Sequence, residues 1–274
     1  MDIRLICMDL DGTALQNDHE TFTPRLLSAL EAAHRKGIAI APVTGRQYQL
    51  LPQPLKEHPR WENLVVLCNG GQVRKLGTGE LLCSLNIGTR QLRQLLVLAE
   101  QFGLPIEFSV DSELYLTGDS LRIQQADPGL RFHRDTILAR HGHVVDSLEP
   151  LCTRDVEKVN LLCISEMERA AVEQAMAQID VSAVWASSRS MEITHAEASK
   201  GNGAAQLCRL LGIPMANVLA LGDSGNDITM LKQAGLGVAM GNAPDFVKAA
   251  ADAVTETNEH DGAAIAIERY ALNI

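Results

Sequence analysis

The stretch IRLICMDLDGT, residues 3–13, decides the fold of this 274-residue chain. Residues 3–8 are rich in Ile, Leu and Cys, which predicts a short strand buried on both faces. The run stops at Asp9, and a second acid, Asp11, follows it. Side chains two residues apart on an extended segment point the same way, so two like charges are expected close together. Such a pair is costly unless a cation lies between the charges or one is protonated, which indicates a functional site. The alternative, that Asp11-Gly12 is an ordinary turn, leaves Asp9 unexplained.

Two more buried strands are expected downstream, at residues 38–43 and 64–67. Between the first two strands, Thr23-Pro24 predicts a helix start, with Thr as N-cap and Pro at the first helical position, and Gly37 predicts the helix end. Strands that alternate with helices are typical of a parallel sheet with helices on both faces. In such sheets the ligand binds at the carboxyl ends of the strands.

The middle of the chain has a different pattern. The pattern changes near residue 82: residues 89–103 predict a helix with one apolar face, and four strand-like pieces and a second helix accompany it, which predicts an α+β insert with an antiparallel sheet. The strand–helix alternation then returns. We therefore expect an α/β fold: a doubly wound, Rossmann-like parallel-sheet core formed by residues 1–83 and 190–274, with an inserted α+β domain at residues 84–189.

Three further turns carry polar side chains at positions where the predicted core would place them near Asp9. Thr44-Gly45-Arg46 closes the second strand and suits a phosphate oxygen, although a helix N-cap is the alternative. GDSGND, residues 222–227, follows a buried strand and gathers hard oxygen ligands that suit Mg²⁺; the alternative is a solvated acidic turn. Lys200 lies where the chain re-enters the core, so we expect it to face the same pocket, although a lone Lys is usually exposed.

Composition narrows the function classes. The formal net charge of −10, from 24 basic and 34 acidic residues, argues against a broad nucleic-acid surface but permits one local cationic pocket for a small anion. No apolar run approaches the roughly 20 residues of a membrane helix, and the N-terminus lacks the pattern of a signal peptide. Six cysteines without a CxxC pair are typical of buried residues in a reducing compartment. We expect a cytoplasmic monomer or weak homo-oligomer.

In this order, the turns resemble the haloacid dehalogenase (HAD) superfamily, Cof-type, subfamily IIB. DLDGT at 9–13 resembles its first motif, Thr44 the second, Lys200 the third and GDSGND the fourth. The insert resembles the C2B cap, the substrate-specificity domain of that branch. The resemblance spans the predicted core and is weakest in the insert.

The resemblance implies a phosphatase mechanism with Mg²⁺ as cofactor. Asp9 would be the nucleophile that forms an aspartyl-phosphate, and Asp11 would protonate the leaving alcohol and then activate water. Asp9, the backbone carbonyl of Asp11, and Asp223 would bind Mg²⁺, with Asp227 supporting the metal site. Four residues would hold the phosphoryl oxygens: Thr44, Gly45, Lys200 and Asn226.

The expected activity is hydrolysis of small phosphorylated metabolites, such as sugar phosphates or pyridoxal phosphate. Asp11 needs a proton near neutral pH, so we expect its pKa to be raised in the substrate complex. Two alternatives stay open: a phosphomutase of the same superfamily, and a non-catalytic phospho-acceptor module. The inserted domain and the second acid of DLDGT argue against the non-catalytic module.

Overall fold

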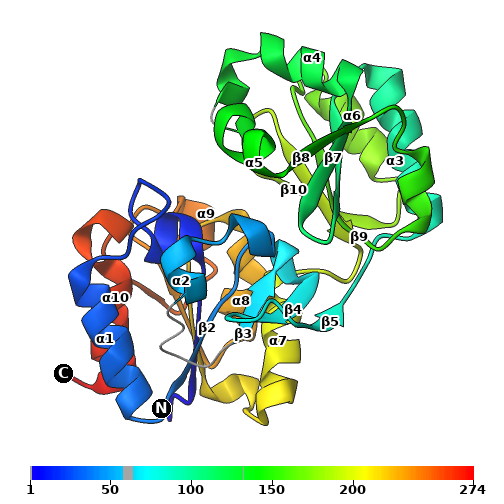
Figure 1. The fold of residues 1–274 in the computed structure, drawn as a ribbon. Coiled ribbons are helices and arrows are strands. Elements are labelled where there is room, and N and C mark those ends of the chain that lie inside the picture. Colours follow the sequence, from blue (N-terminus) through cyan, green and yellow to red (C-terminus); the bar gives the residue numbers. More distant parts are fainter. Residues whose placement is uncertain (1, 58–63, 132) are drawn as a thin grey trace. The chain divides into compact units, whose positions relative to one another are not determined.

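The computed structural model describes residues 2–57, 64–131 and 133–274. The chain forms two compact units, each with its own sheet (Figure 1). Unit 1 consists of Met1–Arg46, Leu51–Cys83 and Ser199–Ile274. Unit 2 consists of Gln47–Leu50 and Ser84–Ala198.

Unit 1 is built on a parallel sheet, as the buried apolar runs predict. In the described part of the chain its order is β14 (Ala253–Val254), β13 (Leu236–Ala239), β12 (Val218–Gly222), β1 (Leu5–Met8) and β2 (Ala39–Pro42). All neighbouring strands pair in parallel. Every residue of β1, β2 and β12 is buried, because helices cover both faces. β1, near the start of the chain, pairs on one side with β12, which lies more than 200 residues later in the sequence.

Helices cover this sheet on two sides, which confirms the predicted doubly wound α/β fold (Figure 1). On one side lie α1 (Pro24–Arg35) and α10 (Gly262–Ile267). On the other side lie α7 (Lys200–Leu211) and α8 (Ile228–Gln233), whose apolar residues share a core cluster with one face of the strands. Unit 1 also contains the short helices α2 (Gln53–Glu57) and α9 (Asp245–Lys248).

The strand predicted at residues 64–67 forms, but its pairing differs from that of the main sheet. This strand, β3 (Leu64–Leu67), pairs antiparallel with β4 (Gln72–Lys75), and β5 (Leu81–Ser84) completes a small three-stranded sheet. A single parallel bridge between Val43 and Val66 joins it to the end of β2. The tight turn after β3 reverses the chain at once, so β4 takes the pairing edge that another parallel strand would need.

Unit 2 contains a six-stranded sheet that is antiparallel except for its last pair. Its order is β10 (Val181–Trp185), β11 (Met191–His195), β9 (Val156–Leu161), β6 (Ile106–Val110), β7 (Glu113–Thr117) and β8 (Gly142–Val145). β7 and β8 pair in parallel. The predicted antiparallel pieces supply β6, β7, β9 and β10, whereas β8 and β11 were not predicted, because each is short and carries histidine or glycine among its apolar residues.

One face of the unit 2 sheet packs on the helices α3 (Thr89–Phe102) and α6 (Arg169–Met176) in an apolar core (Figure 1). The apolar face of α3 was predicted from its spacing, and Leu92 and Leu95 of that face are fully buried. Two further helices, α4 (Gly118–Ala126) and α5 (Ala139–His141), complete the unit.

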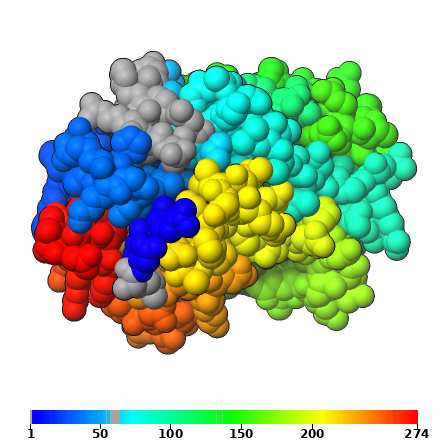
Figure 2. Space-filling view, turned by 90° about the horizontal axis from the view of Figure 1, so that it is seen from below, coloured from blue at the N-terminus to red at the C-terminus, as the bar shows by residue number. Residues whose placement is uncertain are grey.

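The two ends of the parallel sheet in unit 1 differ in chemistry. Where the strands begin, the Asn217 side-chain amide donates to the Asp2 carbonyl at 2.6 Å and the Arg4 amide donates to the Asn217 carbonyl at 2.8 Å. Figure 2 views this end, where the first residues (dark blue) lie at the surface beside the yellow segment that contains α7. The acidic turns follow the opposite ends of the strands, so the candidate site belongs there.

The predicted start of α1 can be tested on its own. The Thr23 hydroxyl accepts a hydrogen bond from the Leu26 amide at 3.1 Å, and Pro24 occupies the first helical position. We expect Thr23→Ala to lower the free energy of unfolding of unit 1 by about 1 kcal/mol, because the amide loses its acceptor. Thr23→Ser keeps the hydroxyl and is the matched control. Urea denaturation followed by circular dichroism would measure both, and an equal loss in the Ser variant would assign the effect to the methyl group instead.

Candidate functional site

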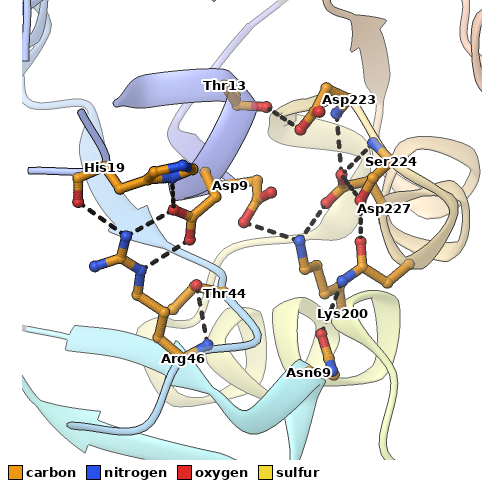
Figure 3. Close-up of polar contacts among 12 residues, drawn as sticks. Asp9, Thr13, His19, Thr44, Arg46, Asn69, Lys200, Asp223, Ser224 and Asp227 are labelled. Carbon is orange, nitrogen blue, oxygen red and sulfur yellow. Dashed lines mark hydrogen bonds and ion pairs between the residues drawn. The ribbon is translucent and has the colours of Figure 1, made fainter. Parts of the chain in front are cut away.

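Three neighbouring strands of unit 1 end in the turns that the sequence singles out. Asp9 follows β1, Thr44 follows β2 after one intervening residue, and Asp223 follows β12. Because β1 lies between β12 and β2 and all three run in parallel, their carboxyl ends meet at one edge of the sheet. Figure 3 shows the side chains that gather there.

Asp9 forms a buried ion pair with the lysine that the sequence places at the return to the core. Lys200 Nζ lies 2.9 Å from Asp9 Oδ1 and 2.7 Å from Asp227 Oδ1 (Figure 3). The exposed fraction of each side chain is 7% or less, so the ammonium group bridges two carboxylates with little access to water. Burial lowers the pKa of Lys200, but the two carboxylates outweigh that effect and raise it, so the side chain stays charged.

The local sequence explains how Lys200 reaches this position. It is the first residue of α7, and the Ser199 side chain caps that helix by accepting from the Asn202 amide at 3.1 Å. The cap fixes where the helix begins, and the helix direction then carries the lysine side chain to the ends of the strands. Lys200 is therefore buried at the candidate site, and the alternative prediction of a solvent-exposed lysine is wrong.

Asp227 organises the turn GDSGND from within. Its Oδ2 accepts the amides of Asp223 and Ser224 at 3.0 and 2.9 Å, while its Oδ1 receives Lys200. The side chain is fully buried, and both of its oxygens already have donors from the protein. This arrangement fits the supporting role that the resemblance implies for Asp227 better than that of a main metal ligand.

Asp9, Asp223 and Asp227 form an acidic cluster whose ligand atoms all lie within 4.8 Å of one another. Burial, with Asp227 as the next cause, raises the pKa of Asp223 to about 6. Burial also raises the pKa of Asp9 well above its usual range, although Lys200 opposes the shift. One lysine cannot neutralise these carboxylates, and close-set carboxylate oxygens are the donors that Mg²⁺ takes in proteins. The residues present therefore fit a divalent cation.

The glycine of DLDGT is required by the closeness of its neighbours. Gly12 has a φ of +72°, and a Cβ at this position would lie 2.4 Å from Asp223 Oδ2. The next residue, Thr13, donates from its hydroxyl to Asp223 Oδ1 at 3.0 Å (Figure 3). Asn242 adds a side-chain hydrogen bond to the Gly12 carbonyl at 2.9 Å. A larger residue at this position would therefore displace the Asp223 carboxylate and adopt a strained backbone conformation.

Asp11 has different partners from Asp9, although the two were expected to share one side of an extended segment. The regular strand ends at Met8, and Asp11 lies in a tight turn. Its carboxylate accepts hydrogen bonds from Arg46 on both oxygens, at 2.8 and 2.6 Å, and lies 2.8 Å from His19 Nδ1. Burial raises the pKa of Asp11, but the hydrogen bonds and charges of Arg46 and His19 together outweigh it and hold the pKa below its usual value. The raised pKa predicted for the substrate complex is not a property of this arrangement.

The candidate phosphate-binding residues lie around the same edge. Thr44 is buried, and its hydroxyl accepts the Arg46 amide at 3.2 Å. Asn226 donates from its side-chain amide to Asn69 Oδ1 at 2.9 Å and accepts the Ser224 hydroxyl at 2.6 Å. Gly45 lies between Thr44 and Arg46 in the same turn. The predicted residues come from separate stretches of the sequence, and the sheet brings them to one place.

No function was predicted from the sequence for Arg46, His19 or Thr13. Arg46 and Thr13 lie next to predicted site residues in the sequence, but their hydrogen-bond partners, Asp11 and Asp223, could not be predicted. His19 lies in a polar loop that carries no pattern. Among the residues that the structure describes, no helix could span a membrane.

Comparison with known proteins agrees with this geometry. The family model for haloacid dehalogenase-like hydrolases matches residues 6–267. YxeH of Bacillus subtilis, named a putative phosphatase, is 33% identical over 98% of both chains. YcsE of the same organism, named a 5-amino-6-(5-phospho-D-ribitylamino)uracil phosphatase, is 27% identical over 99% of this chain and 97% of its own.

Solved structures extend the likeness to the whole fold. BT1666 of Bacteroides thetaiotaomicron, described among phosphatases of the HAD enzyme superfamily, has a TM-score of 0.82 and 25% identity. The match covers 99% of this chain and 96% of that chain. The resemblance seen in DLDGT and GDSGND is thereby confirmed. The chain belongs to the haloacid dehalogenase-like hydrolase family, as an enzyme of the phosphatase type.

Proposed function

We propose that this enzyme hydrolyses phosphomonoesters of small metabolites with Mg²⁺, through an aspartyl-phosphate on Asp9. The observation that carries the proposal is the buried Lys200 bridge between Asp9 and Asp227, next to the carboxylate of Asp223. A carboxylate that attacks a phosphate dianion meets charge repulsion, and a site that concentrates positive charge around that carboxylate opposes it.

In the first step an Asp9 oxygen attacks phosphorus. Lys200 holds Oδ1 at 2.9 Å, and no group among the described residues hydrogen-bonds Oδ2, so Oδ2 is the better placed nucleophile. The new bond joins Asp9 to phosphorus, and the bond from phosphorus to the alcohol oxygen breaks. Asp11 gives the leaving alcohol its proton, for which its carboxylate, ionised beside Arg46, must first take up a proton.

In the second step water attacks phosphorus and Asp11 takes its proton. The bond between phosphorus and Asp9 breaks, which releases inorganic phosphate and restores the Asp9 carboxylate. Lys200, Thr44, Gly45 and Asn226 would hold the phosphoryl oxygens during both steps. This division gives one acid to covalent chemistry and the other to proton transfer, which agrees with their separate partners.

Mg²⁺ would be held by carboxylate oxygens of Asp9 and Asp223 and by the Asp11 backbone carbonyl, with Asp227 supporting the turn. When bound, the cation supplies positive charge that balances the acidic cluster and the phosphate. Asp rather than Glu suits these positions because the shorter side chain has less freedom to misplace an oxygen.

The substrate class follows from charge and from the relatives. The net charge of −10 disfavours large polyanions, whereas the single lysine bridge suits one phosphate group. YcsE, which covers almost this whole chain, is named for a phosphorylated ribityl compound. We propose small phosphorylated metabolites of the sugar phosphate or pyridoxal phosphate type, with the inserted domain, residues 84–189, supplying specificity as a cap.

We expect Asp9→Asn to abolish phosphate release from a panel of phosphomonoesters, by at least about 10³-fold, because the amide is a poor nucleophile. The matched control is Asp180→Asn, which removes an exposed carboxylate of unit 2 and should retain wild-type rates. Phosphate release would be followed colorimetrically. A variant Asp9→Asn that keeps wild-type turnover would remove Asp9 as nucleophile.

Metal dependence should appear in stability as well as in rate. The folded state holds a proton on Asp223 between the ordinary pKa of 3.8 and about 6, where the unfolded state has lost it. The stability of metal-free protein should therefore fall as pH rises through this range. We expect the Tm in EDTA to decrease from about pH 4 to about pH 6, and Mg²⁺ to raise the Tm at about pH 7.

Asp223→Asn is expected to flatten the pH dependence and to weaken the Mg²⁺ effect, whereas Asp180→Asn should change neither. Differential scanning fluorimetry measures all three proteins. A Tm at about pH 7 that does not respond to millimolar Mg²⁺ would contradict the assignment of this cluster as a cation site.

Hydrolysis is distinguished from phosphoryl transfer within a mutase by the fate of water oxygen. In ¹⁸O-labelled water, we expect each released phosphate to carry one ¹⁸O atom, because water attacks phosphorus. Mass spectrometry of the phosphate gives the result. Turnover that moves the phosphoryl group to another hydroxyl of the substrate, with no labelled phosphate, would support the mutase.

A further inference from the structure

Arg46 and Asp11 form a two-bond contact in the candidate site, and the proposed mechanism has not used the arginine. Arg46 Nε lies 2.8 Å from Asp11 Oδ2 and Arg46 Nη2 lies 2.6 Å from Asp11 Oδ1 (Figure 3). Two parallel hydrogen bonds from a planar guanidinium fix both the position and the tilt of a carboxylate. The arginine side chain is 17% exposed and the aspartate side chain 37%, so this pair is partly shielded from water.

The guanidinium also holds a third element. Arg46 Nη2 donates to the His19 carbonyl at 2.9 Å, and the His19 ring lies 2.8 Å from Asp11 Oδ1. His19 stands at the tip of a hairpin that is closed by the Leu15–Phe22 bridge. Arg46 thus contacts Asp11 and the hairpin that follows it in the chain.

The backbone at Arg46 is itself anchored on both sides. Its amide donates to the Thr44 hydroxyl at 3.2 Å, and its carbonyl accepts the Cys68 amide at 3.0 Å. The hairpin tip is similarly braced, because the Asp18 carboxylate accepts the Thr21 amide at 2.9 Å. Because hydrogen bonds fix the backbone at Arg46 and the hairpin that contains His19, the guanidinium has a defined place from which it can orient the Asp11 carboxylate.

Asp11 needs such an anchor because of where the chain puts it. It follows the end of β1 in a turn rather than on a strand, and the acidic cluster of Asp9, Asp223 and Asp227 is close by. Mutual repulsion among like charges displaces a carboxylate that lacks a cation of its own. Arg46 supplies that cation at a fixed place.

We propose that Arg46 is a positioning residue that sets the location of the Asp11 carboxylate and holds it there against repulsion from the acidic cluster. The inference rests on the proposed function, in which Asp11 transfers protons. Arg46 acts through Asp11 and not as a ligand of the substrate phosphate. A misplacement of about 1 Å at a reacting group can cost about 100-fold in rate. We therefore expect loss of the two hydrogen bonds from Arg46 to Asp11 to lower the turnover rate.

The test compares two substrates that differ in their need for an acid. An alkyl phosphomonoester has a poor leaving group and depends on protonation, whereas p-nitrophenyl phosphate has a good one. We expect Arg46→Ala to lower kcat on the alkyl ester by about 100-fold and to affect the aryl ester much less. KM and the inhibition constant of inorganic phosphate should stay within about threefold of wild type, because ground-state binding is unchanged.

Three further variants make the test specific. Arg46→Lys keeps the positive charge but cannot make two parallel hydrogen bonds to Asp11, so it should recover only part of the rate. Arg46→Ala combined with Asp11→Asn should be no slower than Asp11→Asn alone, because both changes act on one group. Arg25→Ala is the matched control: Arg25 makes the same two-bond contact with Glu268, at 3.1 and 2.6 Å, on an exposed surface, and its loss should leave activity unchanged.

Losses that add in the double variant, together with a weakened inhibition by phosphate, would overturn the proposal and make Arg46 a phosphate ligand. Equal losses on both substrates, or none, would also overturn it. Circular dichroism establishes that each variant is folded. A crystal structure of Arg46→Ala gives a readout without turnover: a displaced Asp11 carboxylate supports the proposal, and an unmoved one refutes it. Wild-type protein that is inactive on all esters would refute the proposed function alone. The crystal structure of Arg46→Ala would then decide whether Arg46 positions Asp11.

Discussion

Carboxylates that crowd one edge of a parallel sheet require positive charge, and this requirement governs the site. The sheet ends bring Asp9 and the turn of Asp223 and Asp227 together, and burial removes the water that would otherwise screen them. Lys200 meets part of the requirement from α7. A buried lysine is itself stable only because two carboxylates flank it. Neither group could occupy its place without the other.

The same constraint separates the two acids of DLDGT. Asp9 belongs to the lysine bridge and the acidic cluster, and Asp11 belongs to Arg46 and His19. Two carboxylates only two residues apart therefore experience different surroundings, one crowded by negative charge and one paired with a guanidinium. Different surroundings are what distinct chemical roles require of identical side chains.

Much of this could be predicted from the sequence, because the strongest signals were local. Buried apolar runs gave the parallel sheet, Thr23 and Pro24 gave a helix start, and the acidic turns after strands gave the position of the site. The partners of Arg46 could not be predicted, since they depend on how a turn orients a side chain after the strand ends. The pairing of β3 and the short strands β8 and β11 were also beyond reach, because neighbours distant in the sequence decide them.

The order of strands in unit 1 has a consequence for how the protein is made. β1, which leads to Asp9, has β12 as a neighbour, and more than 200 residues separate them in the chain. During synthesis the ribosome releases Asp9 long before Lys200, Asp223 and Asp227 exist. The edge of the first strand that pairs with β12 must therefore stay unpaired until the chain has passed through residues 84–198 of unit 2. A product that terminates early would carry Asp9 without the lysine and acids that surround it, so the candidate site is assembled only when the last third of the chain has been made.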